Sequence, residues 1–217
     1  MLVRLFWSPK SPFVRKVMVV LHETDQVGDV DTVRTPVQMA EPNPQVLEAN
    51  PLNKIPTLLL DDGRVLLDSR VICEFFARRA NDTALYPNDD AGYFEATSLQ
   101  ALGDGLLDLL LVWRNWHRDR GLAHDAADPY LDAFGLKVTT TLDHLESRAG
   151  ELGERFDIGR VSIAIALAHL DFRWGVLDWR AGRPNLAAWH AEVSDRPSMR
   201  ATRILDDSAT LADGSAS

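Results

Sequence analysis

The segment Ser11-Pro12-Phe13 places a hydroxyl group at the expected start of a helix. Serine favours the N-cap position and proline favours the first helical position. The hydroxyl could cap the free N–H groups of the helix, or it could donate a hydrogen bond to an anion at the positive helix end. A serine nucleophile does not fit the pattern, because no general base lies close to Ser11 along the chain.

A second candidate segment is Lys54-Ile55-Pro56, which directly precedes an apolar run. Proline cannot join a central ladder, so Pro56 belongs at a strand start or at an edge. If the Ile55–Pro56 bond is cis, the backbone of Ile55 turns outward and can pair with a peptide-like ligand as an added strand. A trans proline at a strand start is the alternative.

A third candidate is Asp68-Ser69, at the junction between a strand pattern and a helix pattern. Its simplest interpretation is a helix N-cap with an acidic neighbour. The functional interpretation is that Ser69 and the first N–H groups of the helix hold a carboxylate, while Asp68 faces an ammonium group.

Strand and helix signals alternate through the first eighty residues. Apolar spacing and turn residues predict strands at 2–7 and 29–37, helices at 11–23 and 69–79, and a β-hairpin around Asp62-Gly63. In the helix at 11–23, the spacing predicts that Arg15, Lys16, His22 and Glu23 face outward. This order indicates an α/β layer with a mixed sheet.

The second half of the chain carries helical patterns only, at about 91–120, 130–150, 162–178 and 185–194, with Ser162 as the expected N-cap of the third. The predicted organisation is a first domain at 1–79, a linker at 80–90, an all-helical domain at 91–205 and a disordered tail at 206–217.

Composition narrows the class of protein. Of the 217 residues, 46% are apolar and 25% are charged, which is typical of a globular protein. The net charge of −9 argues against a nucleic-acid partner, and no stretch is apolar enough to predict a membrane span. The single cysteine, Cys73, excludes an intramolecular disulfide and indicates a reducing, cytoplasmic location. We expect Cys73 to be a buried, inert thiol.

Two histidines raise the question of a metal site. His117 and His124 lie close to Asp119 and Asp125, but this spacing matches no standard ligand motif. We therefore expect no metal.

The order of these segments resembles the cytosolic glutathione S-transferase family, in particular bacterial members of the serine type. The resemblance covers about residues 2 to 200, and its most specific parts are "NPLNKIPTLLLDDGRVLLDS" and "VSIAIALAHLDF". It implies a thioredoxin-like N-terminal domain, an all-α C-terminal domain and a homodimer. The family pattern often has an aspartate three residues after the cap serine of the latter segment, where this chain has Ile165.

The resemblance also implies a role for each candidate residue. Ser11 matches the activating serine, with Ser8 on the same loop as a rival. Lys54 matches a residue that holds the glycyl end of glutathione, and the backbone of Ile55 pairs with the cysteinyl unit beside the cis-proline, Pro56. Asp68 and Ser69 match the pair that grips the γ-glutamyl end.

The implied chemistry is conjugation, with the glutathione thiol as the nucleophile. Glutathione is then a co-substrate, and no cofactor is bound permanently. The second substrate is an unknown hydrophobic electrophile, expected between the 7–10 loop and the helix at 107–116. A non-catalytic glutathione-binding or protein-interaction module on the same fold remains the alternative.

Overall fold

The computed structural model describes residues 3–123, 127–153 and 155–206, and these form two units. One unit is Met1–Tyr86 together with Pro197–Ser217, and the other is Pro87–Arg196. The division after Tyr86 falls within the predicted linker. The stretch from Pro197 groups with the first unit, although the sequence pattern placed it with the helices. His124, Asp125 and the predicted tail, except for Asp206, lie outside the described residues.

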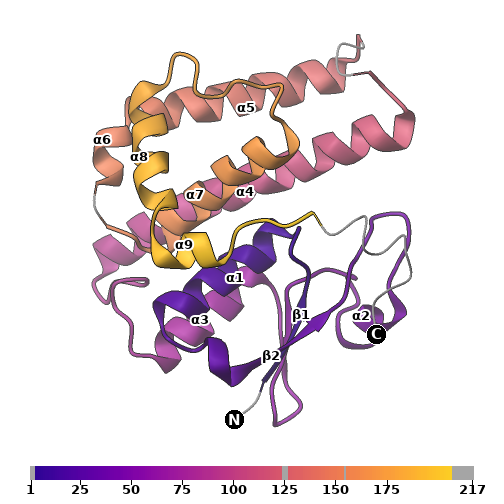
Figure 1. The fold of residues 1–217 in the computed structure, drawn as a ribbon, viewed down its shortest axis with the longest axis vertical. Coiled ribbons are helices and arrows are strands. Elements are labelled where there is room, and N and C mark those ends of the chain that lie inside the picture. The colour runs from indigo at the N-terminus through magenta and orange to yellow at the C-terminus, as the bar shows by residue number, and fades with distance from the viewer. Residues whose placement is uncertain (1–2, 124–126, 154, 207–217) are drawn as a thin grey trace. The chain divides into compact units, whose positions relative to one another are not determined.

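The first unit contains a mixed four-stranded sheet in the order β2-β1-β3-β4. Its strands β1 and β2 are labelled in Figure 1. Strand β1 pairs in parallel with β2 and antiparallel with β3, and β3 pairs antiparallel with β4. The elements of this unit, in chain order, are β1 (Val3–Trp7), α1 (Pro12–Glu23), η1 (Val27–Asp29), β2 (Val30–Arg34), α2 (Pro44–Ala49), β3 (Thr57–Leu59), β4 (Val65–Leu66), α3 (Ser69–Arg79) and α9 (Pro197–Ala201). The predicted α/β fold and the hairpin at Gly63, whose φ is 85°, are confirmed.

Helix α1 is buried more completely than its sequence pattern indicated. It packs against α3 and α9, and Arg15 and Lys16 are only 8% and 0% exposed. The prediction that these two residues face outward is therefore wrong. Arg15 is buried because α9 covers it. The Arg15 guanidinium donates a hydrogen bond of 3.2 Å to the carbonyl of Met199 in α9.

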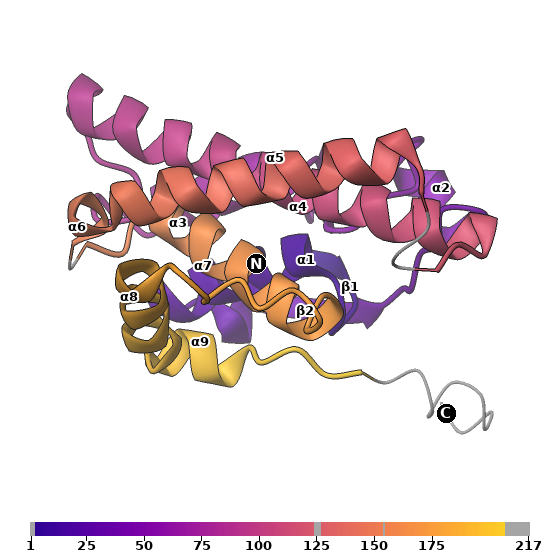
Figure 2. The same cartoon turned by 90° about the horizontal axis from the view of Figure 1, so that it is seen from above.

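The second unit consists of helices in its described residues. They are α4 (Asp90–Arg120), α5 (Pro129–Ser147), α6 (Ala149–Leu152), α7 (Ile158–Arg173) and α8 (Pro184–Ser194). Helices α4 and α5 lie side by side, and α7 packs against α4 (Figure 2). The α4–α7 contact requires glycine at position 103, since a Cβ there would lie 2.6 Å from the backbone carbon of Ser162. The all-helical second half is confirmed.

The N-terminus of α7 corrects the predicted cap. The helix starts at Ile158 and its N-cap is Asp157, whose carboxylate accepts a hydrogen bond of 3.0 Å from the N–H of Arg160. Ser162 is not the cap; it lies in the second turn and is fully buried. The pattern misled because α7 is buried on all sides from Ile158 to Leu167, so no polar face marks where it begins.

Candidate active site

The three candidate segments come together at one end of the sheet. Ser11 follows the end of β1, Pro56 precedes β3 and Asp68 follows β4. Phe6 of β1 is paired with Thr57 of β3, and Leu58 of β3 is paired with Leu66 of β4. Extending these registers outward brings the segments after β1, before β3 and after β4 next to one another. Ligand sites of α/β sheets commonly lie where loops meet at such an end.

Ser11 caps α1 as the sequence predicts. It has extended backbone geometry, and its Oγ accepts a hydrogen bond of 3.3 Å from the N–H of Val14. A hydroxyl has one proton to donate in addition to its acceptor lone pairs. The cap therefore uses only the acceptor side of the oxygen, and the O–H remains able to donate to an anion at the helix start.

Ser8 is less suited to that role. It is 6% exposed, and its Oγ accepts a hydrogen bond of 3.5 Å from the N–H of Lys10. Its carbonyl accepts from the N–H of Ser11 at 3.2 Å, so it shapes the turn that leads into α1. It does not cap the helix, and the partial positive charge of a helix start is concentrated at the cap.

The Ile55–Pro56 peptide bond is cis, which is the geometry that the functional interpretation of this segment required. Within the part of the chain that the structure describes, neither the N–H nor the C=O of Ile55 has a hydrogen-bond partner. The carbonyl of Lys54 accepts bonds from the Asn50 amide at 3.0 Å and from the Thr57 hydroxyl at 2.8 Å. The segment is thus held by its neighbours while the backbone groups of Ile55 stay available.

Lys54 adds a positive charge beside this backbone. Its side chain is exposed, and no carboxylate among the described residues pairs with it. It is therefore available to a ligand carboxylate.

Asp68, and not Ser69, is the N-cap of α3. Its carboxylate accepts a hydrogen bond of 2.9 Å from the N–H of Arg70 and a further one of 2.9 Å from the Arg70 guanidinium. Partial burial acts to raise the pKa of Asp68, but the hydrogen bonds and charge of Arg70, together with the charge of Lys16, outweigh it and hold the pKa below its ordinary value. Asp68 is therefore ionised at neutral pH.

Ser69 is the first residue of α3 and is 2% exposed. Among the described residues its hydroxyl has no hydrogen-bond partner. Since Asp68 already caps the helix, the interpretation of Ser69 as a simple cap is wrong. A hydroxyl and a helix N-terminus at the same point can together hold a carboxylate.

Two residues of this region were missed in the sequence. Arg70 pairs with Asp68. The only feature of the sequence that could have indicated this pair is that Arg70 stands two residues after an acidic helix cap. Lys16 carries no signal of burial, because its spacing from the apolar residues of α1 suggests an exposed position.

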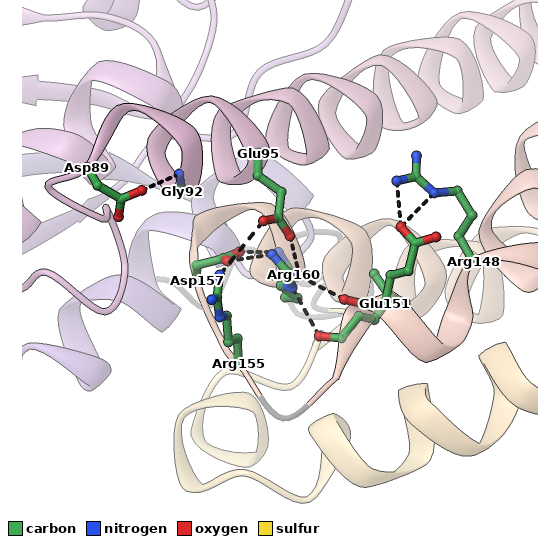
Figure 3. Close-up of polar contacts among 9 residues, drawn as sticks. Asp89, Gly92, Glu95, Arg148, Glu151, Arg155, Asp157 and Arg160 are labelled. Atoms are coloured by element: carbon green, nitrogen blue, oxygen red, sulfur yellow. Dashed lines mark hydrogen bonds and ion pairs between the residues drawn. The ribbon is translucent and has the colours of Figure 1, made fainter.

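A cavity of about 300 Å³ lies within the helical unit. Leu99, Leu102, Leu145 and Leu152 form much of its lining, and Arg160 lies beside it. The nitrogens of Arg160 are bonded to Asp157, Glu95 and the carbonyls of Leu152 and Glu151 (Figure 3). These polar groups are satisfied internally, so we regard the cluster as structural and place the candidate site at the sheet.

The described part of the chain supports neither a reactive thiol of the protein nor a metal site. Cys73 is 0% exposed, as expected for a structural thiol. Within residues 3–123, 127–153 and 155–206, no group of side chains is arranged to hold a metal ion, and no helix is long and apolar enough to cross a bilayer.

Sequence comparison matches residues 5–84 to the glutathione S-transferase N-terminal domain and residues 128–192 to the glutathione S-transferase C-terminal domain. The uncharacterized GST-like protein YibF of Escherichia coli (strain K12) is 29% identical over 203 residues, which are 92% of this chain and 98% of that protein.

Two crystal structures of bacterial relatives are also similar. A glutathione transferase family member from Pseudomonas fluorescens Pf-5, with bound glutathione, is 40% identical with a TM-score of 0.88, over 94% of this chain and 100% of that one. A glutathione S-transferase from Methylobacillus flagellatus KT, with bound glutathione, is 31% identical with a TM-score of 0.81, also over 94% and 100%. With the mixed sheet, the cis-proline segment and the helical second half, these matches show that the chain belongs to the glutathione S-transferase family.

Proposed function

We propose that this protein binds glutathione at the end of the sheet and activates its thiol for attack on an electrophilic small molecule. The observation that carries the proposal is that three groups able to bind a ligand belong to segments at the same end of the sheet. They are the hydroxyl of Ser11, the unpaired backbone of Ile55 and the hydroxyl of Ser69. Each would serve a different part of the same tripeptide.

The charges of the site fit glutathione, which carries two carboxylates and one ammonium group. Lys54 would bind the glycyl carboxylate, while Ser69 and the start of α3 would bind the γ-glutamyl carboxylate. The ionised Asp68 would accept from the γ-glutamyl ammonium, since its carboxylate is half exposed despite the Arg70 pair. The N–H and C=O of Ile55 would pair with the cysteinyl unit as an added strand beside Pro56.

The relatives support this assignment of ligand. The Pseudomonas fluorescens protein is described with bound glutathione and also with bound S-(propanoic acid)-glutathione. In the latter the sulfur already carries a substituent, as it would after conjugation. By analogy, the sulfur position in this chain would leave room for an electrophile. We propose a hydrophobic electrophile, a cytoplasmic location and, by analogy with the family, a homodimer, which light scattering would test.

Calorimetry with glutathione tests binding, and a conjugation assay with a generic electrophile tests turnover. We expect saturable binding and a conjugation rate above the uncatalysed rate. No binding at millimolar glutathione would remove the proposal. Binding without turnover across electrophile classes would favour the non-catalytic glutathione-binding module.

Replacing Ser69 by alanine should weaken glutathione binding about tenfold to a hundredfold. The substitution removes a donor to a charged carboxylate, a loss of about 1.5–3 kcal/mol. Because Asp68 caps α3, the thermal stability of the variant should stay close to that of the wild type. Calorimetry measures the first effect and thermal unfolding the second. An unchanged dissociation constant would show that Ser69 takes no part in binding.

A further inference from the structure

Lys16 is among the largest fully buried side chains of the described residues, with an exposed fraction of 0%. Burying an ammonium group is costly unless anions or dipoles compensate it. An apolar residue of similar volume would fill the same space without that cost. The burial of Lys16 therefore fixes a positive charge inside the first unit.

The ammonium of Lys16 reaches back toward the start of α1. Helical side chains lean toward the N-terminus of their helix. The Nζ atom lies 5.8 Å from the centre of the Phe13 ring, and Phe13 is in the first turn of α1. The positive charge is thus placed close to the turn that Ser11 caps.

The same ammonium also acts on the start of α3. Helix α1 packs against α3, and the Lys16 charge adds to the effect of Arg70 on the Asp68 carboxylate, which caps α3. The Nζ of Lys16 thus lies near the first turn of α1, where the thiol would bind, and its charge acts on the start of α3, which would hold the γ-glutamyl end of glutathione.

The neighbouring charges have other partners or lie elsewhere. Arg15 bonds to the carbonyl of Met199 on α9, and the positive charge of Arg203 also acts on it. Lys10, in the loop before Ser11, pairs with Asp206 at 3.8 Å. On α3, Arg70 pairs with Asp68 at 2.9 Å.

We propose that Lys16 supplies a buried positive charge that favours the thiolate form of glutathione bound at Ser11. The inference rests on the proposed function. Lys16 acts through space and does not touch the sulfur, so its role is to set the electrostatic potential at the helix start. A unit charge at roughly 10 Å in a medium of effective dielectric constant about 20 shifts a pKa by about one unit.

The test is the pKa of the bound thiol in Lys16→Met, with Lys16→Arg and Lys137→Met as controls. Methionine roughly preserves volume without charge, arginine keeps the charge, and Lys137 is an exposed lysine of α5. The bound thiol pKa should rise by about one unit in Lys16→Met and stay at the wild-type value in both controls. Conjugation by Lys16→Met should be about threefold slower at pH 7 and recover at pH values above both pKa values.

A merely structural role for Lys16 would lower the rate at every pH without moving the thiol pKa. Lys16→Gln provides a second neutral variant in case Lys16→Met does not fold. If either folded neutral variant binds glutathione with the wild-type thiol pKa, the inference is overturned while the proposed function stands. Failure of the wild type to bind glutathione would instead overturn the proposed function, and this inference with it.

Discussion

Replacing Arg160 by methionine should lower the free energy of unfolding of the helical unit by about 3–5 kcal/mol. The Arg160 side chain is 3% exposed and pairs at 2.6 Å with Asp157, whose side chain is 2% exposed. Its loss leaves the Asp157 carboxylate buried without a counter-charge and frees the acceptors on Glu95, Leu152 and Glu151. An uncompensated buried charge is among the most destabilising changes in a protein.

Urea unfolding followed by tryptophan fluorescence measures this effect, since five of the six tryptophans lie between Pro87 and Arg196. Arg148→Met is the matched control, because the Arg148–Glu151 ion pair is 55% and 61% exposed. That pair should contribute at most about 1 kcal/mol. A loss below about 1 kcal/mol for Arg160→Met would show that the cluster does not stabilise the unit.

A double variant separates the charge from the packing. Asp157→Asn keeps a side chain that can cap α7 but removes the negative charge. Combined with Arg160→Met, it should recover part of the lost stability, because no unpaired buried charge remains. If the double variant is less stable than Arg160→Met alone, the arginine matters for its packing and its bonds to carbonyls rather than for neutralising Asp157.

The sheet and the start of α1 could be predicted because local signals agree with the tertiary structure there. Ser11 and Pro12 mark a helix start, and Asp62-Gly63 marks a hairpin, in the sequence and in the structure alike. The candidate site could be predicted for the same reason, because its segments lie at the ends of strands that the local pattern indicates. The cis bond at Pro56 was required by the functional interpretation, but proline alone does not determine it.

The failures share one physical cause, which is burial imposed by other elements. Lys16 and Arg15 look like surface residues by spacing and become buried only when α3 and α9 cover α1. Asp157 was overlooked as a cap because α7 lacks a polar face. Neither effect can be seen in a local pattern, because each depends on packing between distant parts of the chain.

Replacing Ser11 by alanine should slow conjugation at pH 7 roughly tenfold while changing glutathione affinity little. A free thiol with a pKa of about 8.5 is about 3% thiolate at pH 7, and a pKa about two units lower makes roughly three quarters of it thiolate. That shift requires about 2.7 kcal/mol. A hydroxyl donor to a charged sulfur supplies about 1.5–3 kcal/mol and the helix end about 0.3–1.

The structure separates this role of Ser11 from its role as a cap. The cap bond to the N–H of Val14 uses the oxygen as acceptor, so its loss should cost about 1 kcal/mol of stability. Ser11→Thr keeps the hydroxyl and should retain most of the rate. If Ser11→Ala is less stable but equally fast at pH 7, Ser11 is a structural residue only.

The most direct measurement is the ultraviolet absorbance of the bound thiolate as a function of pH, for the wild type, Ser11→Ala and Ser8→Ala. We predict a bound thiol pKa about two units below that of free glutathione in the wild type, a value about one to two units higher in Ser11→Ala, and a Ser8→Ala curve that overlays the wild type. Identical curves for the wild type and Ser11→Ala would contradict the assignment of thiol activation to the hydroxyl of Ser11.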